Sequence, residues 1–98
     1  MNEFKLKGKV FNLYEDRGIM YITLRVFHEH TNDGRGEWKE SFFRVLVNDT
    51  MMFPPIRKIR HNEEIIIKGH MCQEYTMTSG GNKRQFVRFY ADEVHTVD

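Results

Sequence analysis

The strongest constraint on the fold of this chain is a single run of residues, Gly36 to Val47. It predicts one β-strand with two different faces, because successive side chains on a strand point to opposite sides. The face expected to pack into a core consists of Phe43, Val45 and Val47. The opposite face carries Trp38, Glu40, Phe42, Arg44 and Leu46. One side of the predicted sheet is therefore apolar, and the other combines aromatic rings with charges.

Two aromatic rings and a guanidinium on the non-core face are costly to expose unless something stacks on them. Nucleic-acid bases are one candidate, since every base has a π-face and the neighbouring phosphate attracts a cation. The alternative is a second buried layer or a subunit interface. This run by itself leaves both interpretations open.

Length and composition are typical of one small globular domain. The 98 residues predict a single domain, residues 1–98, whose core is small enough for oligomerisation to add stability. Fifteen basic and fourteen acidic residues give a net charge of +1, so contacts with nucleic acid require local segregation of charge. No apolar run approaches the roughly 18 residues of a membrane span, and the first residues lack an apolar signal region. We therefore expect a cytoplasmic protein without a membrane partner, and the single cysteine, Cys72, excludes an internal disulfide.

Alternating hydrophobicity predicts five strands. The first, Phe4 to Leu13, places Phe4, Leu6, Gly8 and Val10 on one face and Lys5, Lys7, Lys9 and Phe11 on the other. The remaining strands are expected over Ile19–Phe27, Gly36–Val47, Glu63–Thr78, which bends at Gly69, and Arg84–Val97. A flexible polar loop is predicted over residues 31–36. Between Asn48 and His61, Asp49 or Thr50 is expected to cap a short helix that the two prolines limit to a turn or two.

Five strands with short turns, and one break between the third and fourth, suit a small closed all-β barrel. The oligonucleotide-binding (OB) barrel has this count and order, with its binding face on the second and third strands and the adjoining loops. An SH3-like barrel is the alternative, but its strands are usually shorter and it lacks a connector of this length. We predict a five-stranded OB barrel with a short helix or turn between strands three and four.

Several short pieces of the chain occur in a characteristic order and spacing, namely Gly8-Lys9-Val10, Ile22-Thr23-Leu24, Gly36–Glu40 with Phe42–Val45, Ile65–Gly69, Gly81–Arg84 and Ala91–Val94. In these pieces the chain resembles bacterial single-stranded DNA-binding proteins over nearly its whole length. The resemblance implies an OB barrel that holds single-stranded DNA by stacking and phosphate contacts, as a homodimer or homotetramer and without a cofactor. Because the chain ends at Asp98 without a long acidic tail, it is more similar to small phage- or plasmid-type members. The primosomal replication proteins are close relatives of similar length.

The resemblance also carries over residue by residue. Phe42 stands where the family has a stacking aromatic, and Arg44 follows at a basic position. A second aromatic position on the fourth strand holds Thr76, with Tyr75 beside it on nominally the opposite face. Arg88 replaces a glutamate that is frequent in the family, which is expected to make that surface more basic.

The other candidates are basic residues with aromatic neighbours. Lys5, Lys7 and Lys9 either follow phosphates or form an ordinary solvated strand face that protects an edge. Lys83 and Arg84 lie at a glycine-rich hairpin tip, and Arg88 and Tyr90 are expected to continue their face. The predicted nucleic-acid-binding residues are Trp38, Phe42, Arg44, Lys5, Lys7, Lys9, Tyr75, Lys83, Arg84, Phe86, Arg88 and Tyr90.

Metal binding and catalysis are not expected. His28 and His30 fall on one side of a strand, but a third ligand with suitable spacing is missing, so surface histidines are the better interpretation. The sequence contains neither a phosphate-cradling glycine loop before a helix nor a nucleophile elbow, so we expect no enzyme.

Two functions of different classes remain open. The first is binding of single-stranded DNA with little sequence preference, in replication, recombination or mobile-element DNA processing. The second is an OB-fold adaptor of a primosome or helicase complex, which docks replication or helicase proteins through its aromatic face. In either case the first strand begins almost at the chain start and exposes an edge, which favours a homodimer or homotetramer.

Overall fold

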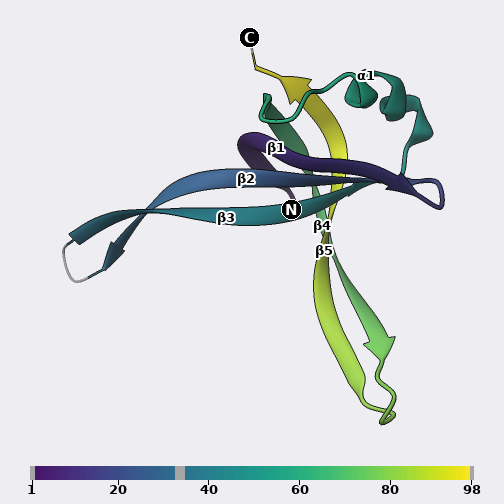
Figure 1. Cartoon of the computed structure of the whole chain (residues 1–98). Helices are drawn as coiled ribbons and strands as arrows, with labels where there is room; N and C mark the ends of the chain where they lie inside the picture. Colours follow the sequence, from purple (N-terminus) through teal and green to yellow (C-terminus); the bar gives the residue numbers. More distant parts are fainter. Residues whose placement is uncertain (1, 33–34, 98) are drawn as a thin grey trace.

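The computed structural model describes residues 2–32 and 35–97, and for residues 29–32 and 35 it describes the backbone alone (Figure 1). Its elements are β1 (Phe4–Asp16), β2 (Ile19–Asn32), β3 (Arg35–Val47), the 3-10 helix η1 (Thr50–Met52), α1 (Phe53–Arg57), β4 (Glu64–Met77) and β5 (Lys83–Thr96). The five strands and the short helix between the third and fourth are confirmed. Within the described ranges, no helix is long and apolar enough to cross a membrane.

The strands close into a barrel in the order β1-β2-β3-β5-β4. Neighbouring strands are antiparallel except β3 and β5, which run parallel. This is the predicted OB barrel. The barrel closes because β1 pairs with two strands. Phe4–Lys9 pair with β4, and the residues from Lys9 onward pair with β2. Gly8 lies where β1 changes partner, and a Cβ there would come within 2.7 Å of the backbone oxygen of Arg25.

Two hairpins extend beyond the barrel as arms, one formed by β2 and β3 and the other by β4 and β5 (Figure 1). The β2–β3 ladder continues to the pairs Thr31–Gly36 and Asn32–Arg35. The predicted loop over 31–36 is therefore wrong for these residues, while Asp33 and Gly34 lie outside the described residues. The polar composition was misleading because an arm surrounded by solvent has no core face to bury, so its strands need no apolar alternation.

Aliphatic side chains from all five strands fill the barrel. Its fully buried members include Ile22, Leu24, Val45, Val47, Ile65 and Ile67, and Phe53 and Ile56 of α1 pack against them. The alternation predicted for β1 is confirmed, since Gly8 and Val10 are buried and the lysines between the inward residues are exposed. Packing of these side chains closes the barrel interior.

Phe43 is less buried than the prediction of a core position implies. It lies on the core side of β3 but is only half-buried, with its ring edge-on to Phe89 and the two centroids 6.0 Å apart. The reason is that β3 pairs with β5 only at Val45 and Leu46. N-terminal to these residues β3 leaves the barrel, so Phe43 is covered less completely than Val45.

A β-bulge makes Phe11 an extra residue of β1. Val10 pairs with Leu24 and Asn12 pairs with Thr23, so Phe11 has no opposite residue on β2. Such a bulge shifts the phase of alternation. Phe11 and Asn12 are consequently both exposed, and Leu13 is half-buried against the core. Phe11 lies on the open face, as predicted.

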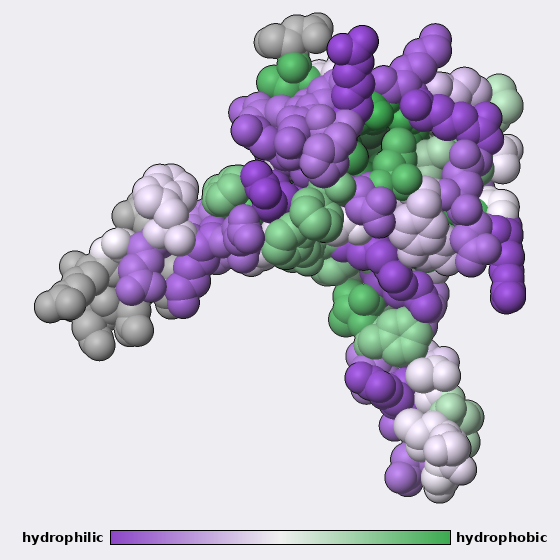
Figure 2. All heavy atoms as spheres, in the orientation of Figure 1, coloured by the Kyte–Doolittle hydropathy of each residue, from purple (hydrophilic) through white to green (hydrophobic). Residues whose placement is uncertain are grey.

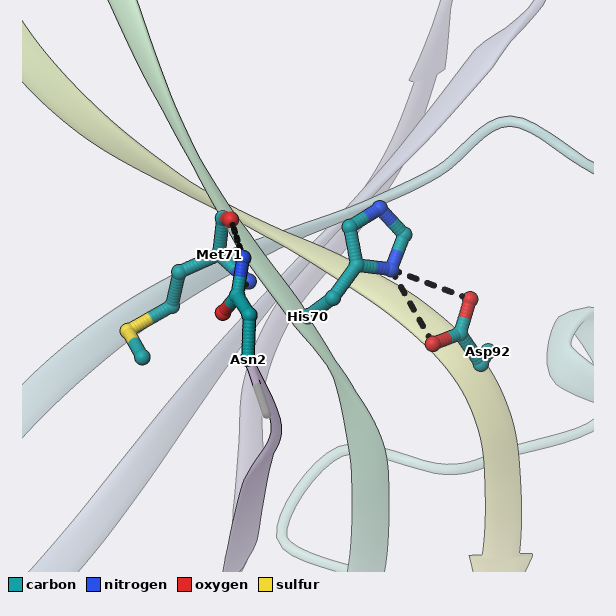
Figure 3. A network of polar contacts seen from close by, with 4 residues as sticks. All are labelled: Asn2, His70, Met71 and Asp92. Carbon is teal, nitrogen blue, oxygen red and sulfur yellow. Dashed lines mark hydrogen bonds and ion pairs between the residues drawn. The ribbon is translucent and has the colours of Figure 1, made fainter.

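A second irregularity, a shift of register between β4 and β5, lies at Gly69, where a bend was predicted. Lys68 pairs with Glu93 and Gly69 pairs with Ala91, which leaves Asp92 as the extra residue on β5. The strands are so close here that a Cβ on Gly69 would overlap the backbone oxygen of Tyr90. The bulged Asp92 carboxylate is hydrogen-bonded to Nδ1 of His70 at 3.0 Å (Figure 3).

The side chain of Asn2 is hydrogen-bonded to β4 at the beginning of the described chain (Figure 3). Its side-chain amide donates to the backbone oxygen of Met71, and its Oδ1 accepts from the Met71 N–H at 3.0 Å. The amide thereby extends the β1–β4 pairing by two residues beyond the pair Phe4–Gly69.

The connector between β3 and β4 is held by side chains at both ends. Asp49 accepts a hydrogen bond of 3.0 Å from the Met51 N–H and caps η1, as predicted. Arg57, in the last turn of α1, donates two hydrogen bonds of 3.0 and 2.6 Å to Glu15 of β1. This contact lowers the pKa of the Glu15 carboxyl and raises the pKa of the Arg57 guanidinium.

Candidate nucleic-acid interface

The outer side of β3 presents the aromatic and basic residues that the sequence predicts there. Phe42 lies opposite Arg25 of β2, and Arg44 lies opposite Thr23. Phe42 is 49% exposed, whereas the opposite face of the strand carries the fully buried Val45. The two-faced character of this strand is confirmed.

Three aromatic rings from β1 and β2 join this side: Phe11, Tyr14 and Tyr21. The Phe11 ring meets the Phe42 ring edge-on, with centroids 5.0 Å apart. The Arg44 guanidinium lies over the Tyr21 ring at 5.1 Å, and Tyr21 is stacked on Tyr14 with centroids 4.9 Å apart and an interplanar angle of 9°. We call these five residues, Phe11, Tyr14, Tyr21, Phe42 and Arg44, the aromatic face.

Sequence reasoning did not include Phe11, Tyr14 and Tyr21 among the site residues. Phe11 was placed correctly on the open face of the first strand, and this was a usable signal. Tyr14 could not be placed by alternation, because the bulge at Phe11 changes the phase of β1. Tyr21 belongs to the face only through its register opposite Leu46 and Tyr14.

The β2–β3 arm continues the aromatic face away from the barrel. Phe27 lies opposite Glu40. The Arg25 guanidinium lies 5.0 Å from the Phe27 ring centroid, and its Nε is 3.8 Å from a Glu40 carboxylate oxygen. Further along, Trp38 is 75% exposed. An indole this open to solvent is available for stacking.

A groove of about 250 Å³ connects β3 with β5. Its lining consists of Phe42, Phe43, Arg44 and Leu46 from β3 and Phe86, Val87, Arg88 and Phe89 from β5. Predicted residues from two distant parts of the sequence thus meet in one depression. Leu46 is on the outer side, as predicted, yet it is only 4% exposed, because it lies between Tyr21 of β2 and Tyr90 of β5.

The register of the β4–β5 arm separates the predicted residues onto two faces. One face carries Arg84, Phe86, Arg88 and Tyr90, which lie opposite Thr76, Glu74, Cys72 and His70. Lys83 lies on the other face with Tyr75, and its Nζ is 5.0 Å from the Tyr75 ring centroid. The prediction that Lys83 shares a face with Arg88 and Tyr90 is wrong, since Lys83 and Arg84 are neighbours on a strand and alternate. The expectation that Tyr75 points to the opposite side is confirmed.

Arg88 does not make its surroundings basic. Its Nε is 2.5 Å from one carboxylate oxygen of Glu74, and the Tyr90 hydroxyl donates a hydrogen bond of 2.5 Å to the other. The Tyr90 hydrogen bond, together with Arg88, lowers the pKa of Glu74, and the same contact raises the pKa of Tyr90. The expectation of a more basic surface at Arg88 is therefore wrong, because the neighbouring strand supplies a carboxylate.

The three lysines of β1 are exposed, as predicted, but they follow the seam between β1 and β4. Lys5 lies opposite Lys68, and Lys7 Nζ is 3.6 Å from a carboxylate oxygen of Glu64. Lys9 lies opposite Arg25 on β2, so it is the member of this row next to the aromatic face.

Figure 2 shows the apolar surface, drawn in green, gathered on the barrel body and at the root of the β4–β5 arm.

Two histidines were considered as metal ligands, and the structure describes the side chain of one of them, His28. Its Nε2 is hydrogen-bonded to the Ser41 hydroxyl at 2.9 Å, across the β2–β3 ladder. The side chain of His30 lies outside the described residues. Within the part of the chain that is described, no three candidate ligands come together for a metal ion.

Comparison with known proteins finds matches among solved structures alone. No family model matches the chain, and no curated protein sequence matches it. A single-stranded DNA-binding protein (SSB) of Plasmodium falciparum, solved with single-stranded DNA, matches with a TM-score of 0.78 and 16% identity over 100% of this chain and 96% of that one. The small single-stranded DNA-binding protein of Streptomyces coelicolor matches with a TM-score of 0.63 and 12% identity over 97% and 93%. A deletion mutant of the Thermus aquaticus single-stranded DNA-binding protein matches with a TM-score of 0.76 and 16% identity, over 100% of this chain and 51% of that one.

The chain has the fold of single-stranded DNA-binding proteins. The resemblance predicted from the sequence is thereby confirmed at the level of the fold. At identities of 12 to 16%, individual residue roles do not transfer, so they have to be argued from this chain's own geometry.

Proposed function

We propose that this chain binds single-stranded DNA with little sequence preference, by stacking bases on the aromatic face and holding phosphates with nearby cations. The observation that carries the proposal is Arg44 lying over Tyr21 on the same surface as the half-exposed ring of Phe42. Rings and a cation thus alternate on one surface, as bases and phosphates do along a strand. The location agrees with the usual OB-fold binding surface on the second and third strands. Similarity to a protein solved with single-stranded DNA supports the same conclusion.

In this proposal each part of the surface has a distinct role. Phe42 and Trp38 stack bases on the barrel and on the β2–β3 arm, and Phe86 adds a ring across the groove. Arg44, Lys9 and Arg84 contact phosphates. Tyr75 and Lys83 act together on the other face of the β4–β5 arm, and Lys5 and Lys7 hold a strand that continues around the β1–β4 seam. The cellular role is DNA processing in replication, recombination or mobile elements.

The proposed assembly is a homodimer or homotetramer. Within the described residues, Phe4–Gly8 pair with β4 along one side, and the ladder to β2 begins only at Lys9. The other side of this segment is therefore an edge that can pair with a second copy. Light scattering at micromolar protein concentration checks this, and a monomeric mass contradicts it.

Titration with labelled oligo-dT and with a duplex of equal length tests the binding function. We expect preference for the single strand and a linear fall of log affinity with log salt, with a slope of about −0.7 per neutralised phosphate. Lack of binding contradicts the proposal. An affinity that does not change with salt instead favours the adaptor role, in which the aromatic face docks another protein.

A further inference from the structure

The cluster formed by Glu74, Arg88 and Tyr90 places a carboxylate on the face shared by Arg84 and Phe86. Glu74 lies directly opposite Phe86 on the neighbouring strand. Phe86 and Arg88 line the same groove as Phe42 and Arg44. A carboxylate is therefore fixed beside the surface to which we assign DNA binding.

We propose that Glu74 withholds the charge of Arg88 from DNA phosphate and so limits the electrostatic part of the affinity. This inference rests on the proposed function. A phosphate approaching Arg88 must compete with a carboxylate that is already 2.5 Å from the guanidinium. It must also approach a like charge, which costs free energy at this distance.

The geometry of the cluster makes this competition effective. Both Glu74 oxygens are engaged, one by Arg88 and the other by the Tyr90 hydroxyl, so the carboxylate is held in place. The side chains of Arg88 and Glu74 are only 27% and 35% exposed, and partly buried pairs are screened less by salt than surface pairs. The guanidinium also lies over the Phe86 ring, 4.8 Å from its centroid, which helps to hold it beside Glu74.

Arg44 provides the contrast within the same groove. Its guanidinium lies over the uncharged Tyr21 ring. Within the described residues no carboxylate lies at ion-pair distance from Arg44, so its charge is available to a phosphate. Two arginines on one groove therefore have opposite roles, one contributing charge and the other neutralised.

The experiment compares wild type, Glu74→Gln and the double variant Glu74→Gln with Arg88→Gln, using labelled oligo-dT over about 50 to 200 mM salt. Glutamine keeps the shape of Glu74, and its carbonyl can still accept from Tyr90, while the amide NH2 that replaces the other oxygen cannot accept from Arg88. We expect Glu74→Gln to bind more tightly and to steepen the salt slope by about 0.7, which corresponds to one further phosphate and about a 2.5-fold larger loss of affinity across that salt range. The double variant is expected to return to the wild-type affinity and slope.

The outcomes separate this inference from the proposed function. If wild type binds oligo-dT and Glu74→Gln binds equally or more weakly, Glu74 does not mask Arg88. A double variant that binds more weakly than wild type likewise shows that Arg88 contacts DNA in the wild type. If neither wild type nor Glu74→Gln binds, the proposed function itself is wrong. Should Glu74→Gln lose its cooperative thermal unfolding, the double variant decides, because neutral glutamines leave no unpaired charge.

Discussion

The guanidinium of Arg44 lies 5.1 Å from the centroid of the Tyr21 ring, across the β2–β3 ladder. Stacking on a ring orients the guanidinium without neutralising it. Tyr21 is in turn stacked on Tyr14, so the cation is supported by two rings in succession. This arrangement places a positive charge in a fixed position on the aromatic face.

Replacing Arg44 tests whether that charge meets a phosphate. We expect Arg44→Gln to weaken oligo-dT binding and to reduce the salt slope by about 0.7, the contribution of one phosphate contact on a single strand. Fluorescence anisotropy at several salt concentrations measures both quantities. Lys58→Gln is the matched control, because it removes the same charge from an exposed position on the connector. Equal effects of the two variants would mean that only net charge matters.

Phe42 should contribute to binding more than to folding. Phe42→Ala removes a ring that is 49% exposed, and we expect a loss of roughly 1–3 kcal/mol in affinity for oligo-dT, the range for one stacking ring. Chemical denaturation should show a nearly unchanged stability. Leu24→Ala, at a fully buried position on β2, should instead lower the free energy of unfolding by about 2–5 kcal/mol. If instead Phe42→Ala lowered the stability and Leu24→Ala weakened binding alone, the binding surface would be on the other side of the sheet.

Trp38 reports on the β2–β3 arm because it is the only tryptophan. Its indole is 75% exposed, so stacking of a base should quench its fluorescence during titration with oligo-dT. Added salt should restore the emission as the complex dissociates. An unchanged emission, in a titration where labelled oligo-dT shows binding, would remove the arm from the interface.

Gly69 is required by the close approach of β4 to β5. In Gly69→Ala the new Cβ would overlap the backbone oxygen of Tyr90, so the bulge must open, and we expect a loss of stability of roughly 1–3 kcal/mol or more. Gly80→Ala is the control, because the nearest atom to a Cβ there is Asn82 Nδ2 at 3.8 Å. Thermal unfolding of the two variants should differ clearly, and similar melting temperatures would contradict the tight crossing.

Acid should weaken the contact between Glu15 and Arg57. The hydrogen bonds from Arg57 hold the pKa of Glu15 below its ordinary value of 4.5. The contribution of this contact to stability is therefore fully present above pH 4.5 and is lost as the pH falls through the lower pKa of the folded state. Melting temperatures measured on acidification should fall less steeply in Glu15→Gln than in wild type, and Arg57→Gln should have the same effect. An unchanged acid dependence in both variants would mean that the contact does not stabilise the fold.

Local patterns in the sequence were enough to predict the strands and the barrel. The alternation of inward residues with lysines in β1 and the two faces of β3 were correct, because the period of two is a property of each strand by itself. The capping of η1 by Asp49 was also predicted from a single residue and its neighbours. The core residues could then be predicted as well, because a barrel of this kind buries the apolar face of each strand.

The tertiary structure decided what the outward residues meet. The sequence placed Arg88 on an outer surface, but only the β4–β5 register brings Glu74 to it. The bulge at Phe11 similarly decides that Tyr14 reaches Tyr21. These relationships depend on the register between paired strands, and a one-residue shift of that register would change them. The sequence alone thus determines which side chains face outward, whereas strand pairing determines whether their charges are free or neutralised.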